Sequence, residues 1–296
     1  MKKLLVLLVA ALFAVTGVAA TGCNQGEKNI RVILREASSG TREAFEKVVK
    51  KGDVSLNDIT EGKTDEYSFV KDHAIANVTA NVITEVENNE NAIGYVSLAS
   101  VGSSVKALKV EGVTPTAQTV QDGDYAIQRP FLLLTRTDGK ITPAAQDFYN
   151  FCMSELALEE IDSEGLVQDP NRTPGTYEKA ELSGSPTIKV SGSSSMREVM
   201  TRLVLAYEEL QPNVNVEQSY TGSGSGRSDV EKDTDGATIG LASSSSPNPS
   251  VYVEHTLCLD AVAVIVNKKN NLSDITIEQL FDIYTGAIMK FSELEA

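Results

Sequence analysis

Residues 32–45 read VILREASSGTREAF, and this stretch combines an apolar run, an arginine, a Ser-Gly-Thr turn and an amphipathic segment. The apolar run predicts a β-strand over 29–34. Apolar residues then recur at helical spacing in the segment after the turn, which predicts a helix. Two further stretches follow the same plan of strand, small polar turn and helix: SGSSSM at 191–196 and YTGSGSGRS at 220–228.

Each of these three turns is suited to hold an anion. The first turn of a helix carries backbone N–H groups without intrahelical partners and the positive end of the helix dipole. Ser and Thr add hydroxyl donors, and Gly lets the backbone approach closely. Arg35 adds a permanently charged fork that can hold a tetrahedral oxyanion by two hydrogen bonds. In the second turn, Ser195 and Glu198 have the spacing of a capping box, which predicts a helix start there.

Composition limits the classes of partner. The chain has 296 residues and a formal net charge of −15, which argues against nucleic acid and anionic membrane surfaces as partners. The first residues, MKKLLVLLVAALFAVTGVAATGC, have a basic start, a short apolar run and small residues before a cysteine. This pattern predicts a signal peptide over 1–22, lipid attachment at Cys23 and a tether over 23–28. We therefore expect an exported protein on the outer face of the cell membrane.

Other chemistry is poorly supported by the sequence. The chain has 2 His and 3 Cys, and no spacing among them resembles a metal site. Cys152 lies in a helical pattern and Cys258 in a strand-like one, so both are expected to be buried single thiols. No serine is matched with an evident general base. We expect no catalytic residue, no metal and no cofactor, and hence no enzyme.

Strands and helices alternate along the whole chain, which predicts the α/β class. Strands are expected at 92–101, 129–137, 214–220 and 258–267, and one helix is expected over 142–161 with Pro143 in its first turn. Residues 166–186 are rich in Pro, Gly and polar residues, so they are expected to form a linker.

Several segments together resemble the extracellular phosphate-binding proteins that serve ABC-type phosphate importers. They are SGSSSMREVMTRLVLAYEELQPNVNVEQSYTGSGSG (191–226), EHTLCLDAVAVIVN (254–267), VILREASSGTREAF (32–45), NAIGYVSL (91–98) and DGDYAIQRPFLLLT (122–135). The resemblance covers nearly all of 29–296. It implies a two-lobed periplasmic-binding-protein-like fold of type II, with a ligand cleft between the lobes.

The order of the two halves differs from that of the family. There the SGSSS half leads and the Arg-x-x-x-Ser-Gly-Thr half follows, whereas here the second comes first. The resemblance therefore implies a circular permutation, with one lobe formed by 29–125 plus 262–296 and the other by 126–261. Two alternatives stay open at this point: a piece of a longer tandem protein, or halves exchanged between the chains of a dimer.

The resemblance also implies the ligand-binding residues. Arg35, Ser39, Gly40 and Thr41 match the clamp, Ser194 and Ser195 match the first serine turn, and Ser225 matches the second. Ser243 stands where many members have an Asp that accepts a proton from phosphate. A hydroxyl can donate or accept, so selectivity for phosphate over another oxyanion is left open.

The implied function is capture of inorganic phosphate for the membrane subunits of an ABC transporter. The alternative is an oxyanion sensor or adhesion protein that keeps the same fold without transport.

Overall fold

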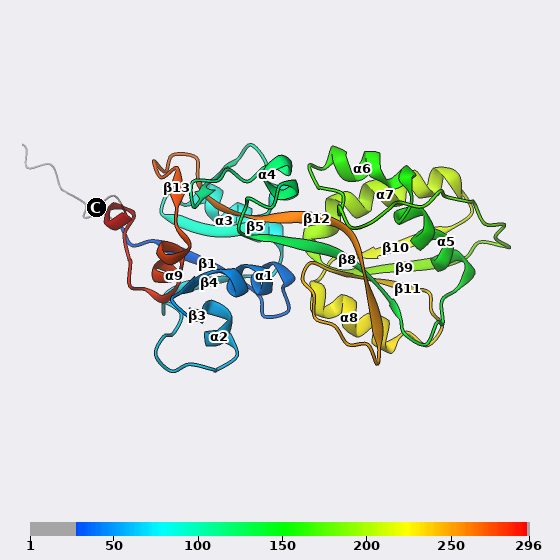
Figure 1. Cartoon of the computed structure of the whole chain (residues 1–296), viewed down its shortest axis with the longest axis horizontal. Coiled ribbons are helices and arrows are strands. Elements are labelled where there is room, and N and C mark those ends of the chain that lie inside the picture. Colours follow the sequence, from blue (N-terminus) through cyan, green and yellow to red (C-terminus); the bar gives the residue numbers. More distant parts are fainter. Residues whose placement is uncertain (1–27, 295–296) are drawn as a thin grey trace, which may run out of the picture.

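The computed structural model describes residues 28–294, and the predicted signal peptide, Cys23 and most of the tether lie outside them. Two lobes lie side by side along the long axis of the molecule (Figure 1). Of the described residues, 28–127 and 261–294 form the first lobe and 128–260 form the second; apart from Val167, their buried cores follow this division. No helix within 28–294 combines the length and apolar character needed to cross a membrane.

A nine-stranded sheet runs through both lobes in the order β10-β9-β11-β8-β12-β5-β1-β4, with β6 beside β12. The first-lobe strands on this path are β1 (Arg31–Arg35), β4 (His73–Ala76), β5 (Ala92–Ser97) and β6 (Val105–Ala107). The second-lobe strands are β8 (Gln128–Arg136), β9 (Thr187–Gly192), β10 (Asn215–Ser219) and β11 (Thr238–Ala242). The 16-residue β12 (Tyr252–Asn267) belongs to both lobes.

Helices cover both faces of the sheet in each lobe. In the first lobe, one face of the sheet is covered by four helices: α1 (Gly40–Val48), α2 (Leu56–Thr60), α4 (Ala117–Gln121) and α9 (Ile277–Thr285). The other face is covered by α3 (Thr79–Asn88). In the second lobe α5 (Pro143–Cys152), α6 (Leu158–Ser163) and α7 (Arg197–Leu210) cover one face, and α8 (Ser223–Lys232) covers the other (Figure 1). The α/β class is thereby confirmed.

Short elements complete the chain. The small sheets pair β2 (Lys50–Lys51) with β3 (Val54–Ser55) and β7 (Lys109–Val110) with β13 (Asp274–Ile275). The 3₁₀ turns are η1 (Leu98–Ser100), η2 (Glu155–Ala157), η3 (Ser194–Met196) and η4 (Phe291–Leu294).

Strands β8 and β12 connect the two lobes and pair antiparallel along most of their length. Opposite each other at the crossing are Arg129 and Asp260, whose side chains are 1% and 0% exposed. The Arg129 Nε and Nη2 atoms donate to Asp260 Oδ2 at 3.0 and 2.9 Å. Burial raises the pKa of Asp260, and the neighbouring Arg129 opposes that rise. A pair this deeply buried disfavours any rearrangement that would separate its partners, because a lone buried charge is costly.

The predicted helix over 142–161 is wrong in one respect: it is interrupted. Thr142 caps α5 by accepting from Ala145 N, and Pro143 occupies its first turn as expected. The helix then ends at Cys152, and η2 and α6 follow. The Ser154 hydroxyl donates to the Phe151 carbonyl at 2.7 Å and also accepts from Leu156 N. Such local side-chain bonds compete with a continuous helix.

The 166–186 segment contains neither helix nor strand, but it is fixed to the second lobe. The buried Asp147 of α5 accepts hydrogen bonds from Tyr177 Oη at 2.9 Å and from Ala180 N at 3.0 Å. Tyr207 and Gln211 donate to the same carboxylate from α7 and its C-terminal end. The segment is therefore part of the packed lobe as well as a connection.

Candidate oxyanion site

The site begins at the carboxyl end of β1, where Arg35 is 1% exposed. Its backbone N–H donates to Tyr95 Oη at 3.2 Å, and the Tyr95 ring stacks on Phe45 of α1 with centroids 4.0 Å apart. This packing fixes the strand end against the helix that follows it. Arg35 is thus held by the core of the first lobe and is not a mobile surface side chain.

The Arg35 guanidinium makes contacts in both lobes. Its Nε and Nη2 atoms donate to the two carboxylate oxygens of Glu36, each at 2.9 Å. Nη1 donates to Thr79 Oγ1 at 3.3 Å, and Nη2 donates to Ser194 Oγ at 3.1 Å. Because Ser194 belongs to the second lobe, Arg35 bridges the two lobes.

The start of α1 faces the second lobe. Ser39 is the N-cap residue and accepts from Arg42 N at 3.3 Å. The Thr41 hydroxyl lies 2.7 Å from the Ser195 hydroxyl across the lobe boundary. Gly40 approaches so closely that a Cβ atom there would lie 2.5 Å from Ser223 Oγ and 2.7 Å from Ser243 Oγ. Only a residue without a side chain fits at this position.

The second lobe contributes a group of buried hydroxyls, which we call the serine cluster: Ser193, Ser223 and Ser243. Ser193 Oγ donates to Ser243 Oγ at 2.9 Å. Ser223 Oγ lies 3.3 Å from Ser243 Oγ and accepts from Ser243 N at 3.1 Å. These three residues are at most 2% exposed. Hydroxyls can reorient to donate to an anion, so the cluster is a source of neutral donors.

Most of the predicted site residues come together here. The structure brings Arg35, Ser39, Gly40 and Thr41 of the first lobe next to a set from the second lobe: Ser194, Ser195 and Ser243. Ser225 lies further along α8 and is only half-buried, whereas Ser223 at the start of that helix contacts Ser243. The ligand-binding role of all eight predicted residues, Ser225 included, stays a prediction.

Three contributors were not predicted from the sequence. Ser193 and Ser223 lie within the two predicted serine turns, and Gly222 before Ser223 has a φ of 128°, a conformation that favours glycine and marks the helix start. Thr79 follows β4 in a stretch without a Ser/Gly pattern, and it is found only through its contacts with Arg35 and Ser194. No sequence signal pointed to it.

The predicted capping box at Ser195 and Glu198 is wrong. Helix α7 begins at Arg197, its N-cap residue is Met196 and no side-chain capping bond is formed. The 3₁₀ turn η3 precedes it, and the Ser195 hydroxyl is bonded to Thr41 instead. A contact between the lobes has taken the place of a local cap.

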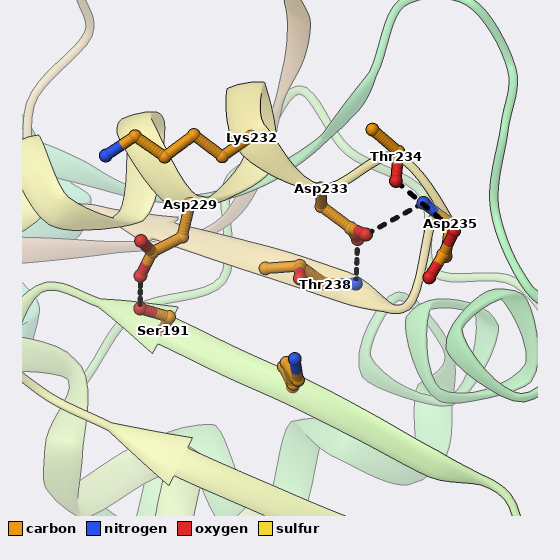
Figure 2. Close-up of a pocket in the computed structure, with 8 residues that line it drawn as sticks. Ser191, Asp229, Lys232, Asp233, Thr234, Asp235 and Thr238 are labelled. Atoms are coloured by element: carbon orange, nitrogen blue, oxygen red, sulfur yellow. Dashed lines mark hydrogen bonds between the residues drawn. The ribbon is translucent and has the colours of Figure 1, made fainter.

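A polar hollow of about 450 Å³ lies on the second lobe beside α8 (Figure 2). Ser191 of β9 donates a hydrogen bond to Asp229 of α8 there. Burial alone would raise the pKa of Asp233, but backbone N–H groups of Asp235, Thr238 and Gly236 donate to its carboxylate and hold the pKa below its ordinary value. The Ser191–Asp229 bond fixes α8 against β9, whereas the Asp233 bonds join the C-terminal end of α8 to the start of β11. Because Ser191 begins one serine turn and α8 follows the other, the bond between Ser191 and Asp229 holds the two turns next to each other.

The geometry fits an oxyanion better than a metal or a nucleophile. The helix starts of α1 and α8 and the turn η3 converge with one arginine and several hydroxyls, which are donors for a tetrahedral anion. Among residues 28–294 no group of three or more His, Cys, Asp or Glu side chains could hold a metal ion. Cys152 and Cys258 are buried and free, as predicted.

Comparison with known proteins places the chain in a family. Residues 16–155 and 177–296 match the model of the PBP superfamily domain. The Streptococcus agalactiae serotype V "Phosphate-binding protein PstS 2" is 32% identical over 305 residues, covering 99% of both chains. The Staphylococcus saprophyticus "Phosphate-binding protein PstS" is 30% identical over 156 residues, covering 49% of this chain and 43% of that one.

A solved structure agrees with these sequence matches. The phosphate-binding protein of a phosphate ABC transporter from Streptococcus pneumoniae TIGR4 is 31% identical, with a TM-score of 0.66, covering 90% of this chain and 99% of that chain. The two-lobed binding-protein fold expected from the sequence is confirmed by this match. The chain belongs to the PBP superfamily and, within it, to the family of phosphate-binding proteins PstS.

Proposed function

We propose that this protein captures inorganic phosphate outside the cell and delivers it to the membrane subunits of an ABC transporter. The observation that carries the proposal is the convergence of Arg35 with hydroxyls from both lobes, Ser194 and Thr41 among them. An anion held by donors from both lobes stabilises the arrangement in which the lobes are in contact. The names of the relatives support phosphate as that anion.

The proposed ligands are Arg35, Ser39, Gly40, Thr41, Ser194, Ser195, Ser225 and Ser243, to which we add Ser193 and Ser223. Arg35 supplies charge, the hydroxyls supply adaptable donors, and Gly40 supplies a backbone N–H at a helix start. No step of bond making or breaking is required of any of them. Binding and release are sufficient for the proposed role.

Titration calorimetry and thermal unfolding test this function. We expect phosphate to bind and to raise the melting temperature, because a ligand at about 100 times its Kd stabilises the folded state by about 2.7 kcal/mol. Sulfate is the comparison ligand, since it is tetrahedral but fully deprotonated. The proposal is contradicted if the protein is folded but gives no heat of binding at about 1 mM phosphate. A Kd of about 1 mM corresponds to a binding free energy of only about −4 kcal/mol. Tighter binding of sulfate would identify a different oxyanion.

We further propose attachment to the membrane by a lipid on Cys23. The support is sequence alone: a basic start, an apolar run and small residues before the cysteine. In cells grown with radiolabelled palmitate, we expect the protein to carry label and the Cys23→Ala variant to lose it and appear in the medium. Equal labelling of both proteins would disprove lipidation at this position.

We also propose that the two halves of this chain are circularly permuted relative to the order described above for the family. Within one chain, Ile30 N donates to Met289 O at 2.7 Å, so the segments near the two ends are neighbours, as a permuted chain requires. The Staphylococcus saprophyticus relative aligns over only about half of each chain. Two proteins whose halves are in opposite order align collinearly over one half at a time. The Streptococcus agalactiae relative aligns over 99% of both chains, which supports the same order of the two halves in that relative and in this chain.

A further inference from the structure

A polar contact joins the lobes beside the serine cluster. Glu43 of α1 accepts a hydrogen bond from Ser244 Oγ of the second lobe at 2.6 Å. Arg227 of α8 donates through Nη2 to the Ser244 carbonyl at 2.6 Å and to Ser244 Oγ at 3.2 Å. Its Nη1 lies 3.8 Å from the same Glu43 oxygen. We call these three residues the latch.

The latch residues are shielded from solvent well enough for their hydrogen bonds to stabilise the closed arrangement of the lobes. The side chains of Arg227 and Glu43 are 17% and 25% exposed, and Ser244 is 4% exposed. Hydrogen bonds to charged groups are stronger than those between neutral groups, and partial burial limits screening by salt. Every bond between Glu43 and the other two residues is lost if the lobes separate, because they belong to different lobes.

Electrostatics argues against Glu43 as an anion ligand. It is a carboxylate two residues after Thr41, and a negative charge at that place repels an incoming oxyanion. Its other oxygen accepts from Lys47 Nζ at 2.8 Å within the same helix. A role in holding the lobes together therefore accounts for Glu43 better than a role in contacting ligand.

We propose that the latch of Glu43, Arg227 and Ser244 stabilises the closed arrangement of the lobes and so slows release of the bound anion. The inference rests on the proposed function. Proposed ligands lie close to the latch in sequence: Thr41 is two residues before Glu43, and Ser243 immediately precedes Ser244. Closing the lobes thus forms the latch and the anion site together, and stabilising one favours the other.

Phosphate release tests the latch. Protein loaded with ³²P-phosphate is chased with unlabelled phosphate, for the unmodified chain, Glu43→Ala, Ser244→Ala and the double variant. We expect each single variant to release about five times faster, the factor for one partly exposed charge-assisted hydrogen bond. The double variant should release little faster than either single variant, because the two residues act through one contact. Raising the salt concentration should accelerate release from the unmodified chain more than from Glu43→Ala.

The matched control is Lys47→Ala, which removes the partner of Glu43 on α1 but no contact between lobes. Its release rate should equal that of the unmodified chain. Simple charge repulsion predicts the opposite sign for Glu43→Ala, namely slower release after removal of a negative charge. Slower or unchanged release from Glu43→Ala, with phosphate still bound by the unmodified chain, overturns the latch. Absence of phosphate binding by the unmodified chain would instead overturn the proposed function.

Discussion

Replacing Arg35 by alanine is expected to weaken phosphate binding at least about thirtyfold. Truncating one partner of a buried, hydrogen-bonded charge pair costs about 2–5 kcal/mol, and a loss of about 1.4 kcal/mol is tenfold in affinity. The effect is compounded here, because Arg35 donates two hydrogen bonds to Glu36. Without Arg35 the Glu36 carboxylate stands uncompensated near the anion. Titration calorimetry measures the loss, and at an unchanged phosphate concentration of about 100 times the original Kd the stabilisation by phosphate should fall from about 2.7 kcal/mol to about 0.9 kcal/mol or less.

Two further variants separate charge, geometry and general damage. Arg31→Ala removes an arginine from the same strand, but the partner of Arg31, Asp72, is largely exposed. We therefore expect the free energy of unfolding to change by less than about 1 kcal/mol and the phosphate affinity to stay the same. Arg35→Lys keeps a positive charge and loses the planar fork, so an intermediate affinity is expected. An Arg35→Ala protein that is folded by circular dichroism and binds phosphate as the unmodified chain does would show that Arg35 is not a ligand.

Local patterns were sufficient to predict most of the sheet and of the proposed site. Strands with long apolar runs, such as β12, and turns with several Ser and Gly residues carry their signal in neighbouring positions. The structure brings Arg35 and Ser194 together although 159 positions separate them. The sequence alone could suggest this proximity only through the family resemblance, since no local pattern fixes the relative placement of two lobes.

The details that sequence patterns missed depend on contacts between segments far apart in the chain. Ser195 has the spacing of a capping residue, yet its hydroxyl is bonded to Thr41 of the other lobe. Thr79 follows a turn without any marker and still contacts Arg35. The segment over 166–186 has the composition of a flexible linker, but Asp147 fixes it through Tyr177 and Ala180. In each case tertiary hydrogen bonds override the local preference.

Replacing Gly40 by alanine should affect stability and binding in opposite directions. Gly40 is the first residue of α1, and alanine favours a helix over glycine by up to about 1 kcal/mol, so the melting temperature without phosphate should be unchanged or slightly higher. The new Cβ would lie 2.5 Å from Ser223 Oγ, 2.7 Å from Ser243 Oγ and 3.0 Å from Ser244 Oγ. These hydroxyls are buried and hydrogen-bonded, so they cannot all turn away without losing a partner.

The lobes of a Gly40→Ala protein must therefore separate slightly to relieve the contact, and donors from both lobes can no longer meet on one anion. Overpacking of this kind costs about 1–3 kcal/mol, which corresponds to about a five- to 150-fold loss of phosphate affinity. Gly102→Ala is the matched control, because nothing lies within 4 Å of a Cβ atom at that position of the same lobe. Calorimetry and thermal unfolding of both variants separate the two effects. Unchanged phosphate affinity of Gly40→Ala would mean that this close approach of the lobes is not needed for binding. A large drop in the melting temperature without phosphate would instead mean that the substitution damages the first lobe itself.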